Sequence, residues 1–114
     1  MHGFSRHDRL RKRAEFLLVS EQGRKLHTTH FIILRKDSPL VAPRIGITVS
    51  RKVGNAVVRN HLKRLVREFF RQNKQLFAAA DYNIIAKKSS AAMAFRDVCN
   101  ELGSAMQRLP KQQC

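Results

Sequence analysis

The chain has 114 residues, 43% of them hydrophobic, which is enough apolar side chain for the core of one domain spanning residues 1–114. Its 23 Lys and Arg residues outnumber the eight Asp and Glu residues, so the formal net charge is +15 at pH 7. An excess of one sign opposes compaction through self-repulsion, and it is typical of proteins that bind a polyanion.

The composition excludes several classes of protein. The longest apolar runs are four or five residues, such as residues 16–19 and 31–34, far shorter than the ~20 residues that span a bilayer. We expect no secretory signal, because residues 1–13 are polar and basic. The only cysteines, Cys99 and Cys114, form no disulfide framework and suit a reducing compartment. The sequence therefore predicts a cytoplasmic protein with no membrane contact and no small-molecule substrate.

The first predicted element is a basic arm, residues 1–12, which we expect to be mobile. A helix is predicted over residues 13–22, ending at Gly23. Its apolar side chains follow helical spacing: Ala14, Leu17 and Leu18, with Phe16 and Val19 widening the apolar side. Strands are predicted over residues 24–28 and 31–35, and the second is apolar on both faces, as in a central strand.

The third predicted strand, residues 44–50, alternates strictly between two kinds of side chain. Apolar residues occupy one face and small or polar residues the other: Ile45, Ile47 and Val49 against Gly46, Thr48 and Ser50. A period of two is typical of a strand that packs one face on a core. We expect the polar face to line a groove.

The remaining elements complete an α-β-β-β-α-β-α order. They are a turn at residues 51–55, a helix over 56–73, a strand over 81–88, and a last helix with Ser89 or Ser90 as its N-cap, ended by Pro110 before a tail at 110–114. This order predicts an α+β fold, a two-layer sandwich of a small four-stranded sheet with helices.

The helix over residues 56–73 has two distinct faces. The apolar face carries Val58, Leu62, Leu65, Val66, Phe69 and Phe70, and the basic face carries Arg59, Asn60, Lys63, Arg64, Arg67 and Arg71. Solvated helix faces usually mix charges, because like charges at i,i+4 repel. The sole acid, Glu68, is expected off the basic face, so the repulsion indicates a phosphate-rich partner. An ordinary solvated helix is the alternative.

The turn before this helix extends the basic face. Arg51 and Lys52 precede Gly54 and Asn55, and Asn55 is a favourable N-cap. Backbone N–H groups at a helix N-terminus attract phosphate. We therefore expect one anion-binding ridge over residues 51–71.

Residues 51–68, RKVGNAVVRNHLKRLVRE, closely resemble the RNR motif of the protein subunit of bacterial ribonuclease P. Other features of that family follow in order: Arg9-Leu10, Phe16, Gly23, the strand at 44–50 and residues 81–86. The resemblance covers nearly the whole chain. It departs at His61, where the family often has a second Arg, and at Ser20 and Leu34, where some relatives have aromatic residues.

The resemblance implies that the chain pairs with a catalytic RNA and with precursor tRNA, and that the ribonucleoprotein removes the 5′ leader as an endoribonuclease. The reaction would use Mg²⁺ bound mainly by the RNA, and the protein alone would not be catalytic. The implied fold is a mixed four-stranded sheet with a left-handed β-α-β crossover, against the usual right-handed rule, and it is related to a domain of a small-subunit ribosomal protein.

Two surfaces are implied. Contacts to the catalytic RNA, which would also aid metal-ion affinity, are implied for Arg51, Lys52, Asn55, Arg59, Asn60, Lys63, Arg64, Arg67 and Arg71. The 5′ leader would lie in a cleft between the first helix and the sheet, lined by Phe16, Thr48, Ser50 and Lys87. An aromatic ring there stacks on any base, although plain core is an equal interpretation of Phe16.

Other functions remain open. A structural RNA-binding protein, such as a ribosomal component, fits the charge and the size. A stand-alone nuclease is disfavoured because the acids are scattered rather than paired on one element. A sequence-neutral DNA binder fits the charge alone. His27 and His30 have H-x-x-H spacing, which we interpret as incidental without further ligands.

Overall fold

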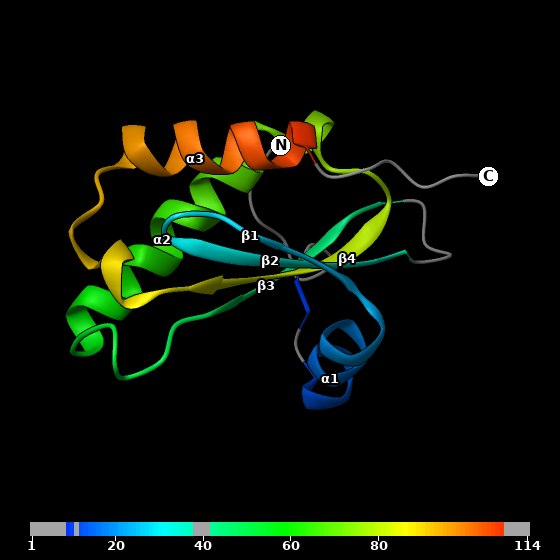
Figure 1. The fold of residues 1–114 in the computed structure, drawn as a ribbon, viewed down its shortest axis with the longest axis horizontal. Coiled ribbons are helices and arrows are strands. Elements are labelled where there is room, and N and C mark those ends of the chain that lie inside the picture. Colours follow the sequence, from blue (N-terminus) through cyan, green and yellow to red (C-terminus); the bar gives the residue numbers. More distant parts are fainter. Residues whose placement is uncertain (1–8, 11, 38–41, 109–114) are drawn as a thin grey trace.

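The computed structural model describes residues 9–10, 12–37 and 42–108 (Figure 1). The elements are α1 (Arg13–Gln22), β1 (Arg24–His27), β2 (Phe31–Asp37), β3 (Arg44–Thr48), α2 (Ala56–Gln72), β4 (Ala80–Ala86) and α3 (Phe95–Arg108), with short 3-10 helices η2 (Lys74–Leu76) and η3 (Lys88–Ala92). This confirms the predicted order of helices and strands. No helix within the described ranges is long and apolar enough to cross a membrane. The predicted tail at 110–114 lies outside those ranges.

The four strands form one mixed sheet in the order β1-β2-β4-β3. β1 and β4 run antiparallel to β2, whereas β3 and β4 are parallel and are connected through α2. Figure 1 shows α2 and α3 over one face of the sheet and α1 against the other. The predicted sandwich is confirmed, and α1 adds partial cover to the second face. The left hand of the crossover stays a prediction of the resemblance.

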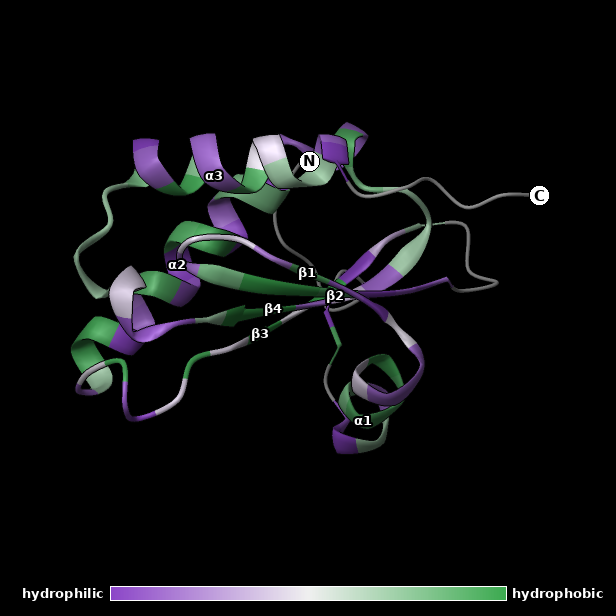
Figure 2. Ribbon diagram, in the orientation of Figure 1, coloured by the Kyte–Doolittle hydropathy of each residue, from purple (hydrophilic) through white to green (hydrophobic). Residues whose placement is uncertain are grey.

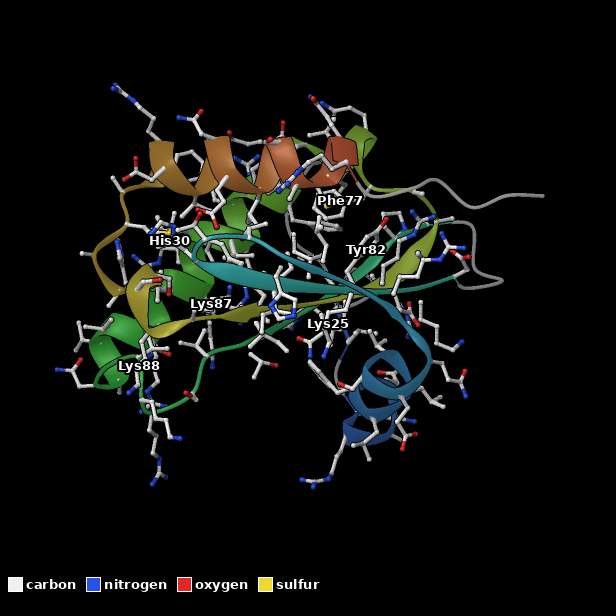
Figure 3. The ribbon with its side chains drawn as sticks, viewed as in Figure 1. Lys25, His30, Phe77, Tyr82, Lys87 and Lys88 are labelled. Carbon is white, nitrogen blue, oxygen red and sulfur yellow. The ribbon has the colours of Figure 1, made fainter. Side chains whose placement is uncertain are left out.

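The main core lies between the sheet and helices α2 and α3. Alternate strand residues point into it: Phe31 and Ile33 from β2, Ile45 from β3, and Tyr82 and Ile84 from β4. The Phe77 ring meets Phe70 and Tyr82 edge to face, with centroids 4.8 and 5.1 Å away (Figure 3). Figure 2 shows the central strands as predominantly hydrophobic, so the sheet forms one side of this core.

The opposite face of the sheet carries a small second cluster formed by Leu10, Val19 and Leu34. Val19 is the only buried residue of α1, while Leu17 and Leu18 are 48% and 44% exposed. The apolar side expected from helical spacing is therefore buried only in part: Val19 is buried and Phe16 half-buried, whereas Leu17 and Leu18 face solvent. Apolar residues surround most of α1, so their spacing does not single out one face.

Gly23 ends α1 as predicted, because the chain packs too closely there for a side chain. A Cβ atom on residue 23 would lie 2.4 Å from the carbonyl oxygen of Val19 and 2.9 Å from that of Arg35. The φ angle of Gly23 is −81°, which any residue adopts. The requirement is one of space, and it brings the end of α1 against β2.

The start of α3 differs from the prediction. Ser89 and Ser90 lie in η3, and the buried Ser90 hydroxyl donates to the carbonyl of Lys87 instead of capping a long helix. α3 begins at Phe95, where the Asp97 carboxylate accepts a hydrogen bond from the Ala94 N–H at 3.1 Å. Serine caps short and long helices alike, so the sequence alone did not distinguish them.

Part of the predicted basic arm is docked on the edge of the sheet. Arg9 forms a parallel bridge with Ile45 of β3, and the Leu10 N–H donates to the Ile45 carbonyl at 2.9 Å. Leu10 is buried. Residues 1–8 and 11 of the arm lie outside the described residues.

Candidate nucleic-acid interface

Two side-chain hydrogen bonds stabilise the turn before α2. The Asn55 side chain accepts from the Val58 N–H at 3.0 Å, which confirms Asn55 as the N-cap. Arg59 Nε donates to the Gly54 carbonyl at 3.2 Å, so this guanidinium braces the turn. Arg51 and Lys52 are exposed. Two predicted RNA contacts therefore face solvent beside the helix N-terminus.

The apolar face of α2 is buried as predicted. Leu62, Leu65, Val66, Phe69 and Phe70 all pack into the main core. The helix is thus fixed in rotation, and its opposite face points away from the sheet. Val57, which does not belong to this apolar face, is 77% exposed.

The polar face of α2 forms a hollow of about 410 Å³. Its lining residues are Asn60, Lys63, Arg64, Arg67, Glu68 and Arg71. Five of the predicted RNA contacts therefore come together, whereas Arg59 and Asn55 lie at the N-terminal end of the same helix. A concave surface with several positively charged side chains is suited to binding a phosphate backbone.

Glu68 lies among these cations, and the prediction that it stands off the basic face is wrong. Its carboxylate pairs with the Arg71 guanidinium and accepts from the Gln72 amide at 2.7 Å. The hydrogen bonds from Arg71 and Gln72 lower the pKa of Glu68, and the bond to Glu68 raises the pKa of Arg71. Arg71 is thus partly neutralised, which leaves Lys63, Arg64 and Arg67 as the principal cations of the hollow.

Arg67 also lines a second hollow, of about 250 Å³. The other lining residues of this second hollow include Arg9, Phe16 of α1 and Gly46 of β3. Burial and the nearby charge of Arg9 lower the pKa of the Arg67 guanidinium. A like charge nearby disfavours the charged form of a guanidinium, and an anion bound in this hollow would offset that effect. Arg9 was missing from the predicted RNA contacts, since only the pairing of residues 9–10 with β3 brings it here.

Phe16 lies over Gly46, and its environment accommodates both interpretations of its role. A Cβ atom on residue 46 would meet the ring carbons at 2.4 and 2.6 Å, so glycine is required beneath the ring. Phe16 packs on the cluster of Leu10, Val19 and Leu34, yet it is only half-buried and also lines the second hollow. One side of the ring is core and the other is accessible.

The polar face of β3 continues from Gly46 away from α1. Thr48 is exposed and its hydroxyl donates to Asn83 Oδ1 at 3.0 Å, and Ser50 beyond it is exposed as well. Lys87, the fourth predicted cleft residue, is half-buried, and its Nζ donates to the Thr28 carbonyl at 2.6 Å (Figure 3). Its charge is therefore committed in part to the β1–β2 turn.

The two histidines of the H-x-x-H spacing have different environments. His30 Nδ1 lies 2.6 Å from Glu101 Oε1, while His27 is exposed. Within the described ranges, no three His, Cys, Asp or Glu side chains gather closely enough to hold a metal ion. At the three departures from the family pattern, His61 and Ser20 are exposed and Leu34 is buried.

Comparison with known proteins identifies the family. The family model described as Ribonuclease P matches residues 4–110. The chain is 50% identical over 109 residues to the ribonuclease P protein component of Geobacter sp. (strain M21), covering 96% of this chain and 94% of the relative. The solved RNase P protein from Thermotoga maritima has a TM-score of 0.83 and 36% identity, covering 89% of this chain and 99% of that one. A structure of the Staphylococcus aureus RNase P protein has a TM-score of 0.83 and 31% identity, covering 88% and 93%. The chain therefore belongs to the ribonuclease P protein family.

Proposed function

We propose that this chain, as a ribonuclease P protein component, binds the catalytic RNA with α2 and the 5′ leader of precursor tRNA with the adjoining face of the sheet. The observation that carries this proposal is the position of Arg67, which lines both hollows. Because Arg67 belongs to both surfaces, two RNA molecules bound to them would lie next to each other.

The catalytic RNA binds along the turn and the outer face of α2 in this proposal. Arg51, Lys52, Lys63 and Arg64 supply the charge, and the capped N-terminus at Asn55 supplies N–H groups for a phosphate. Each phosphate that a Lys or Arg neutralises releases condensed counterions, so assembly depends strongly on salt. With a net charge of +15, the protein also screens the repulsion between the two RNA partners.

The 5′ leader lies across Phe16 and along the polar face of β3. The accessible side of the Phe16 ring stacks on a base, and Thr48 and Ser50 offer hydroxyl groups beyond it. Stacking tolerates any base, which suits leaders of differing sequence. Lys87 adds positive charge at the border of this surface, although its Nζ is shared with the Thr28 carbonyl.

Cleavage itself belongs to the catalytic RNA and to Mg²⁺ held mainly by that RNA. The described residues do not fit a magnesium site, because no three of their His, Cys, Asp or Glu side chains gather closely enough to hold a metal ion. Five of their carboxylates are instead engaged in ion pairs within the fold: Glu15 and Asp81 with Arg44, Asp37 with Arg35, Glu68 with Arg71, and Glu101 with His30. The chain's contribution to metal-ion affinity is therefore indirect, through the phosphates that it positions. The complex acts in the cytoplasm.

The test is cleavage of precursor tRNA by the reconstituted ribonucleoprotein at a low Mg²⁺ concentration. Catalytic RNA with the protein should cut the 5′ leader, and the protein alone should not. Binding should be tighter for precursor than for leaderless tRNA. Cleavage by the protein without RNA would instead identify a stand-alone nuclease, and absence of any effect on the catalytic RNA would identify a purely structural RNA-binding protein.

A further inference from the structure

Arg44 connects α1 to the sheet through two carboxylates, one on each side. We propose that these three residues, Glu15, Arg44 and Asp81, fix the position of α1 and thereby the width of the leader cleft. This inference rests on the proposed function of the cleft. We call the three residues the Arg44 bridge.

The geometry of the Arg44 bridge is that of a strong, directional contact. Arg44 Nε and Nη2 donate to the two carboxylate oxygens of Asp81, both at 2.9 Å, and Nη1 donates to Glu15 Oε2 at 2.7 Å. The side chains of Glu15, Arg44 and Asp81 are 26%, 22% and 11% exposed, so solvent screens them only in part. The hydrogen bonds that Arg44 donates to Asp81 and Glu15 outweigh burial and raise the pKa of Arg44.

The bridge joins the first turn of α1 to the start of two strands. Arg44 and Asp81 are register partners in the parallel pair β3–β4. The second oxygen of Glu15 accepts from the Lys12 N–H at 3.1 Å, which caps α1. One carboxylate thus secures the helix end and attaches it to the sheet.

Apolar packing alone holds α1 weakly against the sheet, so the Arg44 bridge contributes much of its attachment. Val19 is the only buried residue of this helix, and Leu17 and Leu18 face solvent. The small cluster on this side of the sheet contrasts with the main core under α2 and α3. An ionic contact at Glu15, one turn before Val19, gives the helix a second point of attachment to the sheet.

The proposed leader surface begins at this attachment. Phe16 follows Glu15 in α1, and Gly46 lies two residues after Arg44, on the same face of β3. Because the Phe16 ring rests on Gly46, a displacement of the first turn of α1 moves the ring relative to Thr48. Arg44 is therefore a positioning residue for leader binding, and it does not itself contact the leader.

The test is the variant Glu15→Gln in the reconstituted holoenzyme. Glutamine keeps the size of the side chain and an oxygen for the Lys12 N–H, but it presents an amide donor to Arg44. Glu21→Gln is the matched control, since Glu21 is an exposed acid near the end of the same helix. Affinity is measured for precursor and for leaderless tRNA, together with amide hydrogen exchange of residues 14–22.

The expected result is a loss of about fivefold in precursor affinity, with leaderless affinity unchanged and faster exchange in α1. Arg44→Lys, which cannot form the fork to both carboxylates, should show the same selective loss. Wild-type precursor affinity, or equal losses for both substrates, would overturn the inference. If the wild-type holoenzyme binds both substrates equally, the proposed leader function fails. Hydrogen exchange of Glu15→Gln then decides whether the bridge holds α1.

Discussion

Neutralising two cations of the α2 hollow, Lys63 and Arg64, should weaken assembly with the catalytic RNA and reduce the salt dependence of that assembly. Lys63 and Arg64 line the hollow, and no ion pair with an acid of the described residues occupies either one. The double variant Lys63→Gln, Arg64→Gln removes both charges while preserving the length of polar side chain. Because neither residue packs in the core, the fold should be unaffected.

The magnitude follows from counterion release. Each phosphate contact contributes about 0.7 to 0.9 to the slope of log affinity against log salt concentration. Two lost contacts should therefore reduce that slope by about 1.4 to 1.8. Arg71→Gln should reduce it by less than one contact, because Arg71 shares its charge with Glu68.

The assay is filter binding of the labelled catalytic RNA over a series of salt concentrations, with circular dichroism as a check on folding. A folded double variant with the wild-type slope would refute the assignment of this helix face to RNA. A uniform loss of affinity at every salt concentration would also count against it, because that pattern indicates lost nonionic contacts.

Three further changes test separate parts of the structure. Glu68→Gln should strengthen binding to the catalytic RNA and raise the salt slope by about 0.8, because Arg71 becomes available; a weaker complex would contradict this. Gly46→Ala should destabilise the fold by about 1 to 3 kcal/mol through its clash with the Phe16 ring, as measured by urea denaturation, and unchanged stability would show that the ring is free to move. Glu101→Gln should make the stability of the fold depend less on pH under acidic conditions. Burial alone would raise the pKa of Glu101, but hydrogen bonds from the β1–β2 turn outweigh it and lower the pKa below its ordinary 4.5. The wild-type carboxylate therefore stabilises the fold fully above pH 4.5 and loses that contribution as the pH falls further, so wild type and variant should converge at low pH in thermal denaturation.

The parts of the fold that were predicted correctly are those with a single strong local pattern. The predicted ends of α2 agree with the structure to within one residue, because its apolar residues follow one helical stripe and Asn55 caps it. Gly23 was found as the end of α1 because glycine commonly stands there. In both cases the local preference and the tertiary packing agree.

The errors have a physical cause in side-chain length and in contacts distant along the chain. A helical wheel fixes the direction of a Cβ atom, but the carboxylate of Glu68 extends far enough to reach Arg71. The position of Arg9 depends on pairing with β3, and the orientation of α1 depends on Arg44, both of which join residues far apart in the sequence. Local periodicity carries no information about such contacts.

Site-specific crosslinking in the assembled holoenzyme tests the central claim most directly. A photoreactive side chain at position 48, on the polar face of β3, should crosslink to the 5′ leader of precursor tRNA. The same group at position 64, on α2, should crosslink to the catalytic RNA. Crosslinks from both positions to the same RNA molecule would contradict the account of two adjoining surfaces with separate partners.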